Sequence, residues 1–491
     1  MQAATKLPYS FCKRYGVVTG ANTNEGINLA TRQSTPLEAI IEAQRILGMV
    51  GQVTIASDQE FNRLLSQHFE SNRETSLSEA EKIGGDLNLH DVARELSEPE
   101  DLLESDDDAP IIRLINALIT EAIKENASDI HVEPFESRLS IRFRVDGVLR
   151  EVLEPPRQIA NLLCSRIKVM AQLDIAEKRL PQDGRIALKV ANRPVDIRVS
   201  TLPSGHGERV VMRILDKQAG RLDLLQLGMD DMTRKCLSTM IERPHGIILV
   251  TGPTGSGKTT TLYAILSALN DARRNILTVE DPVEYDLDGI GQTPVNSKVD
   301  MTFAKGLRAI LRQDPDVVMV GEIRDSETAQ IAVQASLTGH LVLSTLHTNS
   351  AVGAITRLQD MGVEPFLLSS TLLGIVSQRL VRNLCGFCKS PISLNDDERA
   401  KYGIDQQVTI FQPGACPKCL QTGYKGRSGI YEVIEVDDIL AGKIHDGESQ
   451  ANIERYSRTQ SRSLRDDGIR RVIQGDTSLD EVLRVTRDNL Q

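Results

Sequence analysis

The segment HGIILVTGPTGSGKTTTLYAIL, residues 245–266, joins a buried-strand run, a glycine-rich loop and a helical run. The loop fits the phosphate-binding pattern GxxxxGK[ST], whose glycines let backbone N–H groups converge on phosphate oxygens. Lys258 would reach the β- and γ-phosphates, and the Thr259 hydroxyl would hold Mg²⁺. The alternative, a plain glycine-rich turn, is disfavoured because strand, loop and helix follow in the required order. We expect ATP and Mg²⁺ to be bound by Gly252, Pro253, Thr254, Gly255, Ser256, Gly257, Lys258, Thr259 and Thr260.

Two later buried strands end in acidic residues. ILTVEDPVEY, residues 276–285, ends in a cluster that contains Glu280, and DPDVVMVGEIRD, residues 314–325, ends in Glu322. A carboxylate at the carboxyl end of a strand in a parallel sheet faces the ligand crevice. We therefore predict catalytic roles for both, with Glu322 serving Mg²⁺, the attacking water, or both. The alternative for Glu322 is a solvated loop acid.

A fourth strand, HLVLSTLHT, begins beside His340 and ends at His347. A histidine beside a phosphate site can sense or position the γ-phosphate, but it can equally be a satisfied structural group. Both histidines are candidate catalytic residues. We expect this strand to lie between the phosphate-loop strand and the Glu322 strand. That order leaves room for a water-activating acid and favours a hydrolysis-driven motor over a nucleotide kinase.

Four of the seven cysteines form two CxxC pairs, separated by 27 residues. Four thiolates in two short turns are typical of a closed structural zinc site, which has no open position for catalysis. The spacing is longer than usual for such a site, so we expect an insertion between the pairs. An iron–sulfur cluster or four merely buried thiols remain alternatives. The predicted zinc ligands are Cys385, Cys388, Cys416 and Cys419, and we expect Cys12, Cys164 and Cys236 to be small buried hydrophobic residues.

Length and charge patterning divide the chain. With 491 residues, the chain is too long to form a single compact hydrophobic core, so we expect several domains. Between Glu95 and Asp108 there are eight carboxylates and no basic residue, as expected for a solvated linker. We predict a small, mainly helical docking domain at 1–95, a linker at 96–109 and an α+β domain at 110–217. A RecA-like α/β motor domain would follow at 218–491, with a zinc subdomain at about 380–430 and C-terminal helices.

The α+β assignment rests on hydrophobic periodicity. IIRLINALITEAIKE, residues 111–125, has one apolar helical face, and RLSIRFRVDGVLREV, residues 138–152, alternates as strands do around an Asp146-Gly147 turn. RIALKV, RPVDIRVS and ERVVMRIL add three further strands, the first two joined around Ala191-Asn192. Arginines line the polar faces of these strands.

Composition excludes several classes of protein. The net charge of −11, the absence of Trp and an aromatic content of 3% argue against a nucleic-acid partner. No apolar run approaches the roughly 18 residues of a membrane-spanning helix, and the first residues do not resemble a signal peptide. We expect a cytoplasmic protein that reaches a membrane only through a protein partner.

Four segments carry a family resemblance: GPTGSGKTTTLY, ILTVEDPVEY, DPDVVMVGEIRD and SLTGHLVLSTLHTN. Together with the cysteine insertion, they closely resemble the general secretion pathway protein E family of type II secretion ATPases. The resemblance is dense over residues 110–440 and loose before residue 95. It implies a hexameric ATPase at the cytoplasmic face of the inner membrane that drives pseudopilus assembly and so powers protein export. Its N-terminal domain would dock on the cytoplasmic part of a bitopic membrane protein, and a multispanning platform protein would be the second contact.

The resemblance also implies a PAS-like α+β domain that supplies Arg198 and Arg213 to the nucleotide. The residues alone would have favoured a solvated basic face for these two. In the motor domain, the family arginines match Arg308, Arg312, Arg324, Arg357 and Arg427. A type IV pilus assembly ATPase shares every motor motif and is the leading alternative. A zinc-bearing helicase and a scaffold that binds ATP without hydrolysis are weaker ones.

Overall fold

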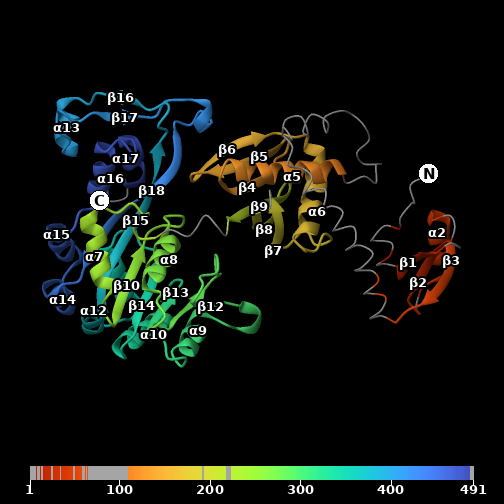
Figure 1. The fold of residues 1–491 in the computed structure, drawn as a ribbon, viewed down its shortest axis with the longest axis horizontal. Coiled ribbons are helices and arrows are strands. Elements are labelled where there is room, and N and C mark those ends of the chain that lie inside the picture. The colour runs from red at the N-terminus through yellow and green to blue at the C-terminus, as the bar shows by residue number, and fades with distance from the viewer. Residues whose placement is uncertain are drawn as a thin grey trace. The chain divides into compact units, whose positions relative to one another are not determined.

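The computed structural model describes most of the chain after residue 108 and part of the region before it (Figure 1). The described residues are 7, 12, 15–23, 26–33, 35–47, 50–57, 61, 64, 109–190, 193–216 and 223–486. Residues 96–108 of the expected linker at 96–109, the turn at Ala191-Asn192 and the expected boundary at 217–218 lie outside them. The chain falls into two compact units. The first contains residues up to 214 without 126–129 and 143–150, and the second contains those two stretches and 215–491.

The N-terminal region is built around a three-stranded sheet. Its elements are β1 (Val17–Thr23), β2 (Gly26–Thr31), α2 (Leu37–Leu47) and β3 (Val50–Ile55). β2 pairs with β1 in antiparallel and with β3 in parallel orientation. Val18 and Leu29 of the sheet and Ala43 of the helix are fully buried in one small core. The prediction of a mainly helical domain is therefore wrong for residues 17–55, because the short alternating strands gave a weaker signal than the helix at 37–47.

The α+β region contains the helix and the five strands that periodicity predicted, together with a strand at 127–134 and helices at 157–159 and 160–170 that were not predicted. They are α5 (Ala109–Lys124), β4 (Ala127–Pro134), β5 (Leu139–Val145), β6 (Val148–Leu153), η1 (Arg157–Ile159), α6 (Ala160–Met170), β7 (Gln182–Val190), β8 (Arg193–Ser204) and β9 (Gly207–Asp216). The six strands follow the order β6-β5-β4-β9-β8-β7. The apolar face of α5 is buried, and Asp146 and Gly147 both take positive φ angles, as a tight two-residue hairpin requires.

The motor region contains a seven-stranded sheet of order β12-β11-β13-β14-β10-β15-β18 (Figure 1). Its strands are β10 (Gly246–Thr251), β11 (Ile276–Glu280), β12 (Gly291–Pro294), β13 (Val317–Val320), β14 (Leu341–Leu346), β15 (Leu372–Leu384) and β18 (Tyr424–Glu435). All pairs are parallel except β15–β18. As predicted, β14 lies between β10, which precedes the phosphate loop, and β13, which precedes Glu322.

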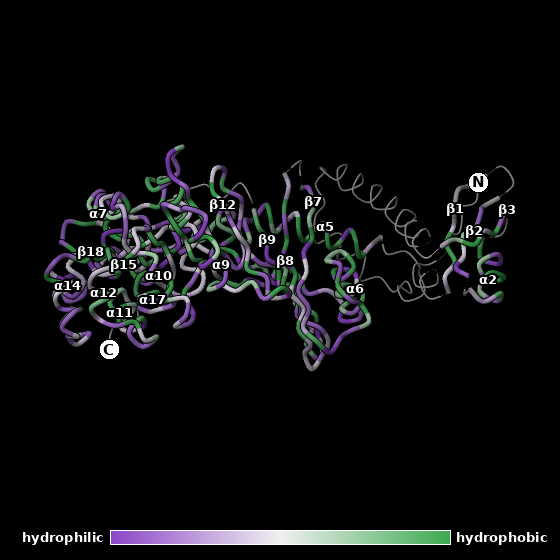
Figure 2. The backbone as a smooth tube through the Cα atoms, turned by 90° about the horizontal axis from the view of Figure 1, so that it is seen from below, coloured by the Kyte–Doolittle hydropathy of each residue, from purple (hydrophilic) through white to green (hydrophobic). Residues whose placement is uncertain are grey.

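Helices cover both faces of this sheet, so its strands are apolar on both sides. In β10, Ile247 and Leu249 join one buried cluster, whereas Ile248 and Val250 join the other. Figure 2 colours the backbone of this region by hydropathy, and β15 is labelled there. The helices in this part are α7 (Asp231–Ile241), α8 (Lys258–Leu269), α9 (Phe303–Ile310), α10 (Ser326–Leu337), α11 (Val352–Asp360) and α12 (Pro365–Thr371), with the short η2 (Ser297–Val299).

The cysteine pairs lie where β15 ends and shortly before β18 begins. The chain between them forms β16 (Ser390–Ile392), α13 (Asp396–Tyr402), β17 (Ile410–Gln412) and η3 (Pro417–Cys419), which is the expected insertion. The C-terminal helices are α14 (Asp438–His445), α15 (Gln450–Gln460), α16 (Leu464–Ile473) and α17 (Leu479–Thr486). Among the described residues, no helix is both long and apolar enough to cross a membrane.

Candidate nucleotide site and cysteine cluster

The phosphate loop, residues 252–257, connects the carboxyl end of β10 to the first residue of α8. Gly252 and Gly257 adopt φ angles of 147° and 89°. A Cβ on Gly252 would lie 2.5 Å from the Gln378 carbonyl oxygen, and one on Gly257 would lie 2.7 Å from Gln378 Nε2. Both positions therefore require glycine. The loop presents the N-terminus of α8, which favours bound anions.

Lys258, the first residue of α8, is buried, with 9% of its surface exposed. Its ammonium group donates to the carbonyl oxygens of Gly252 (2.9 Å) and Pro253 (3.0 Å). Burial lowers the pKa of Lys258 to about 8; the Glu322 carboxylate opposes this shift, and the Arg379 guanidinium adds to it. In this geometry the Lys258 ammonium group is bound to carbonyl oxygens of the loop itself. It would have to leave them to bind a phosphate group.

The remaining predicted loop residues differ in exposure. Ser256 is buried, whereas Pro253, Thr254, Gly255 and Thr259 are exposed, and Thr260 is half-buried. Thr259, the predicted Mg²⁺ ligand, is thus open to solvent. All the predicted nucleotide-binding residues lie in one continuous stretch, formed by the phosphate loop and the first turn of α8, at the carboxyl edge of the sheet.

Glu322 lies at the same edge of the sheet, two residues beyond β13. Its side chain is 15% exposed and forms an ion pair with Arg324. On its other oxygen, Oε2 is 3.2 Å from Nε2 of His347, which directly follows β14. Arg324 also lies 3.6 Å from the carboxylate of Asp281. A partly covered acid that contacts a histidine and whose charge acts on Lys258 is an arrangement that can orient and deprotonate a water molecule.

Glu280 lies at the end of β11 and is only 3% exposed. Its carboxylate accepts hydrogen bonds from Tyr263 of α8, from Thr278 (2.6 Å) and from Gln292 (3.1 Å). Burial, followed by the charge and the hydrogen bond of Glu280, raises the pKa of Tyr263. These contacts tie the phosphate-loop helix to β11 and β12. The sequence pattern contained no indication that Tyr263 would bind this carboxylate.

The structure does not bring His340 to the phosphate loop of its chain. In the parallel β10–β14 pair, Gly246 faces Leu341 and Thr251 faces Leu346, so His340 lies at the amino edge and the phosphate loop at the carboxyl edge. Six residues of strand, roughly 20 Å, separate the two edges. His340 Nδ1 instead lies 2.8 Å from the Ala335 carbonyl oxygen and 3.1 Å from the Thr338 hydroxyl. It is the satisfied structural histidine of the alternative interpretation.

Arg198 and Arg213 lie on β8 and β9, on the faces opposite the buried rows that contain Ile197 and Met212. Arg198 is half-buried and Arg213 is exposed. Both belong to the first compact unit and Lys258 to the second, so their approach to a nucleotide stays a prediction. In the motor region, Arg308 forms an ion pair with Glu327 at 2.7 Å.

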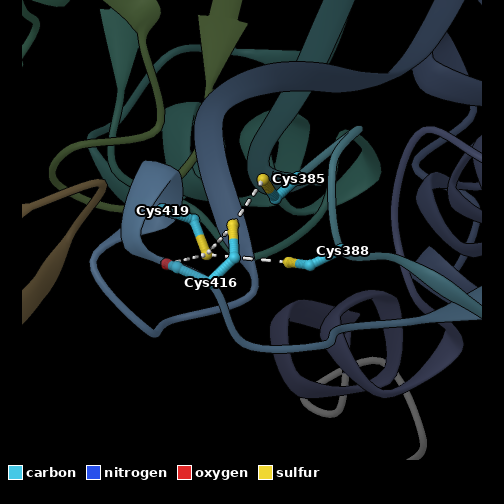
Figure 3. Close-up of side chains that lie close together, drawn as sticks. All are labelled: Cys385, Cys388, Cys416 and Cys419. Carbon is cyan, nitrogen blue, oxygen red and sulfur yellow. Dashed lines mark hydrogen bonds between the residues drawn. The ribbon is translucent and has the colours of Figure 1, made fainter.

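The four predicted zinc ligands come together, and Figure 3 shows their sulfur atoms turned toward one another. The Sγ atoms of Cys385 and Cys416 are 3.8 Å apart, those of Cys388 and Cys419 3.7 Å, and those of Cys416 and Cys419 3.6 Å. A tetrahedral zinc ion with bonds of about 2.3 Å requires sulfur–sulfur edges of about 3.8 Å, whereas a disulfide needs about 2.05 Å. The donor set therefore fits zinc. Of the other cysteines, Cys12 and Cys164 are buried as expected, and Cys236 is only half-buried.

The fold and the site define a class of protein: a RecA-like P-loop ATPase with a four-cysteine insertion. Residues 104–484 match the family described as "Type II/IV secretion system protein", and residues 6–69 match an N-terminal domain described for GSPII protein E. The chain therefore belongs to the Type II/IV secretion system protein family and, within it, to the type II secretion system protein E ATPases.

Two relatives support this assignment over almost their full length. Type II secretion system protein E of Pseudomonas aeruginosa is 60% identical, with 98% of this chain and 96% of the relative covered. Type II secretion system ATPase E of Vibrio cholerae is 57% identical, with coverages of 99% and 98%. Among solved structures, the pilus retraction motor PilT with bound ADP is 26% identical with a TM-score of 0.51, covering 75% of this chain and 95% of that one. The Legionella pneumophila ATPase DotB, at 21% identity, 77% and 96% coverage and a TM-score of 0.57, shares the fold.

Proposed function

We propose that the chain is the motor of a type II secretion system, which hydrolyses ATP as a homohexamer and drives pseudopilus assembly. The observation that carries this proposal is the meeting of Lys258, Glu322 and His347 at one edge of the sheet, in a chain of this family. The high identity to secretion ATPases favours this function over type IV pilus assembly.

The phosphate chemistry follows from the residues at that edge. Lys258 leaves the loop carbonyls and binds the β- and γ-phosphates. Mg²⁺, held by the Thr259 hydroxyl, would neutralise part of the phosphate charge. Glu322 accepts a proton from water as the water oxygen bonds to the γ-phosphorus; the bond from that phosphorus to the bridging oxygen breaks and leaves ADP and phosphate. His347 orients the carboxylate, and Glu280 holds β11 against α8.

Zinc bound by Cys385, Cys388, Cys416 and Cys419 would be structural. All four positions around the ion are occupied by thiolates, so it has no place for substrate. Its effect would be to fix the insertion between β15 and β18.

The domain division proposed from the sequence gives each part a task. Residues 1–95 dock on the cytoplasmic domain of a bitopic inner-membrane protein, and the linker at 96–109 separates that docking from the motor. The PAS-like region at 110–217 supplies Arg198 and Arg213 to the nucleotide of the motor at 218–491. The protein thereby works at the cytoplasmic face of the inner membrane, where a multispanning platform protein is the second contact.

Hydrolysis measured with and without the cytoplasmic domain of the bitopic protein tests this function. We expect that domain to stimulate turnover by the full chain but not by a variant that lacks residues 1–95. A chain that binds but never hydrolyses ATP, with or without the partner, would contradict the proposal.

A further inference from the structure

The strand next to the phosphate loop carries an arginine that none of the motifs includes. In the parallel β10–β15 pair, Thr251 faces Ser377, so the next residues of β15 continue past the point where β10 gives way to the loop. Gln378 packs against that loop. Its carbonyl oxygen lies so close to Gly252, and its side-chain amide so close to Gly257, that neither glycine could carry a Cβ atom. Its Oε1 also accepts a hydrogen bond from Thr261 of α8 at 2.7 Å. The end of β15 is thus one wall of the phosphate loop.

Arg379 is the next residue of β15, so its side chain leaves the opposite face of the sheet from that of Gln378, and it is only 6% exposed. Its guanidinium donates to the carbonyl oxygen of Asn349 at 3.1 Å. Asn349 lies two residues after His347, in the loop that leaves the carboxyl end of β14. One arginine therefore joins the wall of the phosphate loop to the loop that carries the Glu322-bound histidine.

The charge of Arg379 also acts on the phosphate loop. After burial and the opposing effect of Glu322, Arg379 is the third influence on the pKa of Lys258, and it lowers that pKa. Two cations held close together in a poorly hydrated place repel each other and favour an anion between them. A guanidinium suits phosphate because its planar N–H groups can bind two oxygens at once, whereas an ammonium acts as a point charge.

We propose that Arg379 is a second cationic residue of the phosphate site, which binds the β- and γ-phosphates of ATP together with Lys258. This inference rests on the proposed ATPase function and deepens it. Because Arg379 also holds the loop after β14, the binding of phosphate is coupled to the position of His347. Arg379 would prefer ATP to ADP, since the γ-phosphate adds the charge nearest the histidine loop.

The test is nucleotide binding to the full chain, measured with ATP and with ADP for Arg379→Gln and Arg379→Lys. We expect Arg379→Gln to weaken ATP binding about 10- to 100-fold and ADP binding less, as for a lost hydrogen bond to a charged group. Arg379→Lys should recover part of the loss. Arg382→Gln is the matched control: it lies on the same strand but is paired with Glu481, and it should leave the ATP-to-ADP ratio of affinities unchanged.

A structural role alone gives a different pattern. If Arg379→Gln lowers the melting temperature but keeps the parent's affinities for ATP and ADP, Arg379 is an anchor for Asn349 and the inference is wrong. Lys258→Ala in the same assay separates this failure from failure of the proposed function. If Lys258→Ala also binds ATP like the parent, the phosphate-loop assignment itself fails; if only Lys258→Ala loses binding, the ATPase proposal stands without Arg379.

Discussion

Nε2 of His347 lies 3.2 Å from Oε2 of Glu322, although the two residues leave different strands, β14 and β13. The histidine is about half exposed and the carboxylate is mostly covered, with side-chain exposures of 49% and 15%. Because adjacent parallel strands end at the same edge, the sheet itself brings the pair together. The contact suggests that His347 acts through Glu322.

This coupling can be measured with a double-mutant cycle. Glu322→Gln should lower turnover by at least about 100-fold and spare ATP binding, because water activation is lost while the loop remains. His347→Asn alone should lower turnover about 10-fold, and it should add little in the Glu322→Gln background. If the fold-changes in turnover rate of the two single variants multiply in the double variant, so that their activation free energies add, the two side chains act independently.

His340 supplies the contrasting substitution. His340→Asn removes the ring that lies beside Ala335 and Thr338, at the far edge of the sheet. We expect a loss of about 1 kcal/mol in the free energy of unfolding, with turnover close to that of the parent. If the folded variant has a turnover defect as large as that of His347→Asn, His340 does take part in catalysis at the phosphate site.

Lys258 predicts an unusual pH dependence. Its pKa of about 8 in the nucleotide-free chain means that the ammonium form is lost above pH 8 rather than above 10.5. ATP needs the charged form, so binding at higher pH must include proton uptake, and affinity falls as pH rises through 8. ATP affinity should therefore be about 10-fold weaker at pH 9 than at pH 7. An affinity that stays flat up to pH 9.5 would rule out this depressed pKa.

The cysteine cluster predicts one zinc ion per chain by elemental analysis. Cys385→Ser should lose the metal and lower the melting temperature by at least about 5 °C, while basal hydrolysis per folded molecule changes little, because the closed site touches no substrate. Cys236→Ser is the control and should keep the metal, since Cys236 is not part of the cluster. Purified protein with iron and a visible chromophore would support the iron–sulfur alternative instead.

The arginines of the α+β region could bind the nucleotide of their own chain or that of a neighbouring subunit. We predict that ATP draws Arg213 onto the motor domain of its own chain and that hydrolysis releases it. Arg213→Ala and Lys258→Ala should each nearly silence turnover. A mixture of the two variants, under conditions of subunit exchange, should stay inactive because every site keeps one lesion. Clear recovery of activity would mean that the arginine acts across a subunit interface.

The sequence by itself determined the features whose chemistry is local. The phosphate loop could be predicted because Gly252, Gly257 and Lys258 act within one short segment. The cysteine pairs could be predicted because the two cysteines of each CxxC lie in the same short turn. The position of His340 could also have been inferred, because the residue that begins a parallel strand lies at the edge away from the ligand.

Only the tertiary structure decided the contacts made between strands. The Tyr263–Glu280 hydrogen bond joins a helix to a strand end, and Gln378 lies against the phosphate loop because β15 pairs with β10, which is more than a hundred residues earlier in the chain. Neither relationship has a fixed spacing in sequence, since the lengths of the intervening loops and helices are free to vary. The order of the strands in the sheet determines which of these residues become neighbours. That order is fixed by the burial of the apolar strands on both faces.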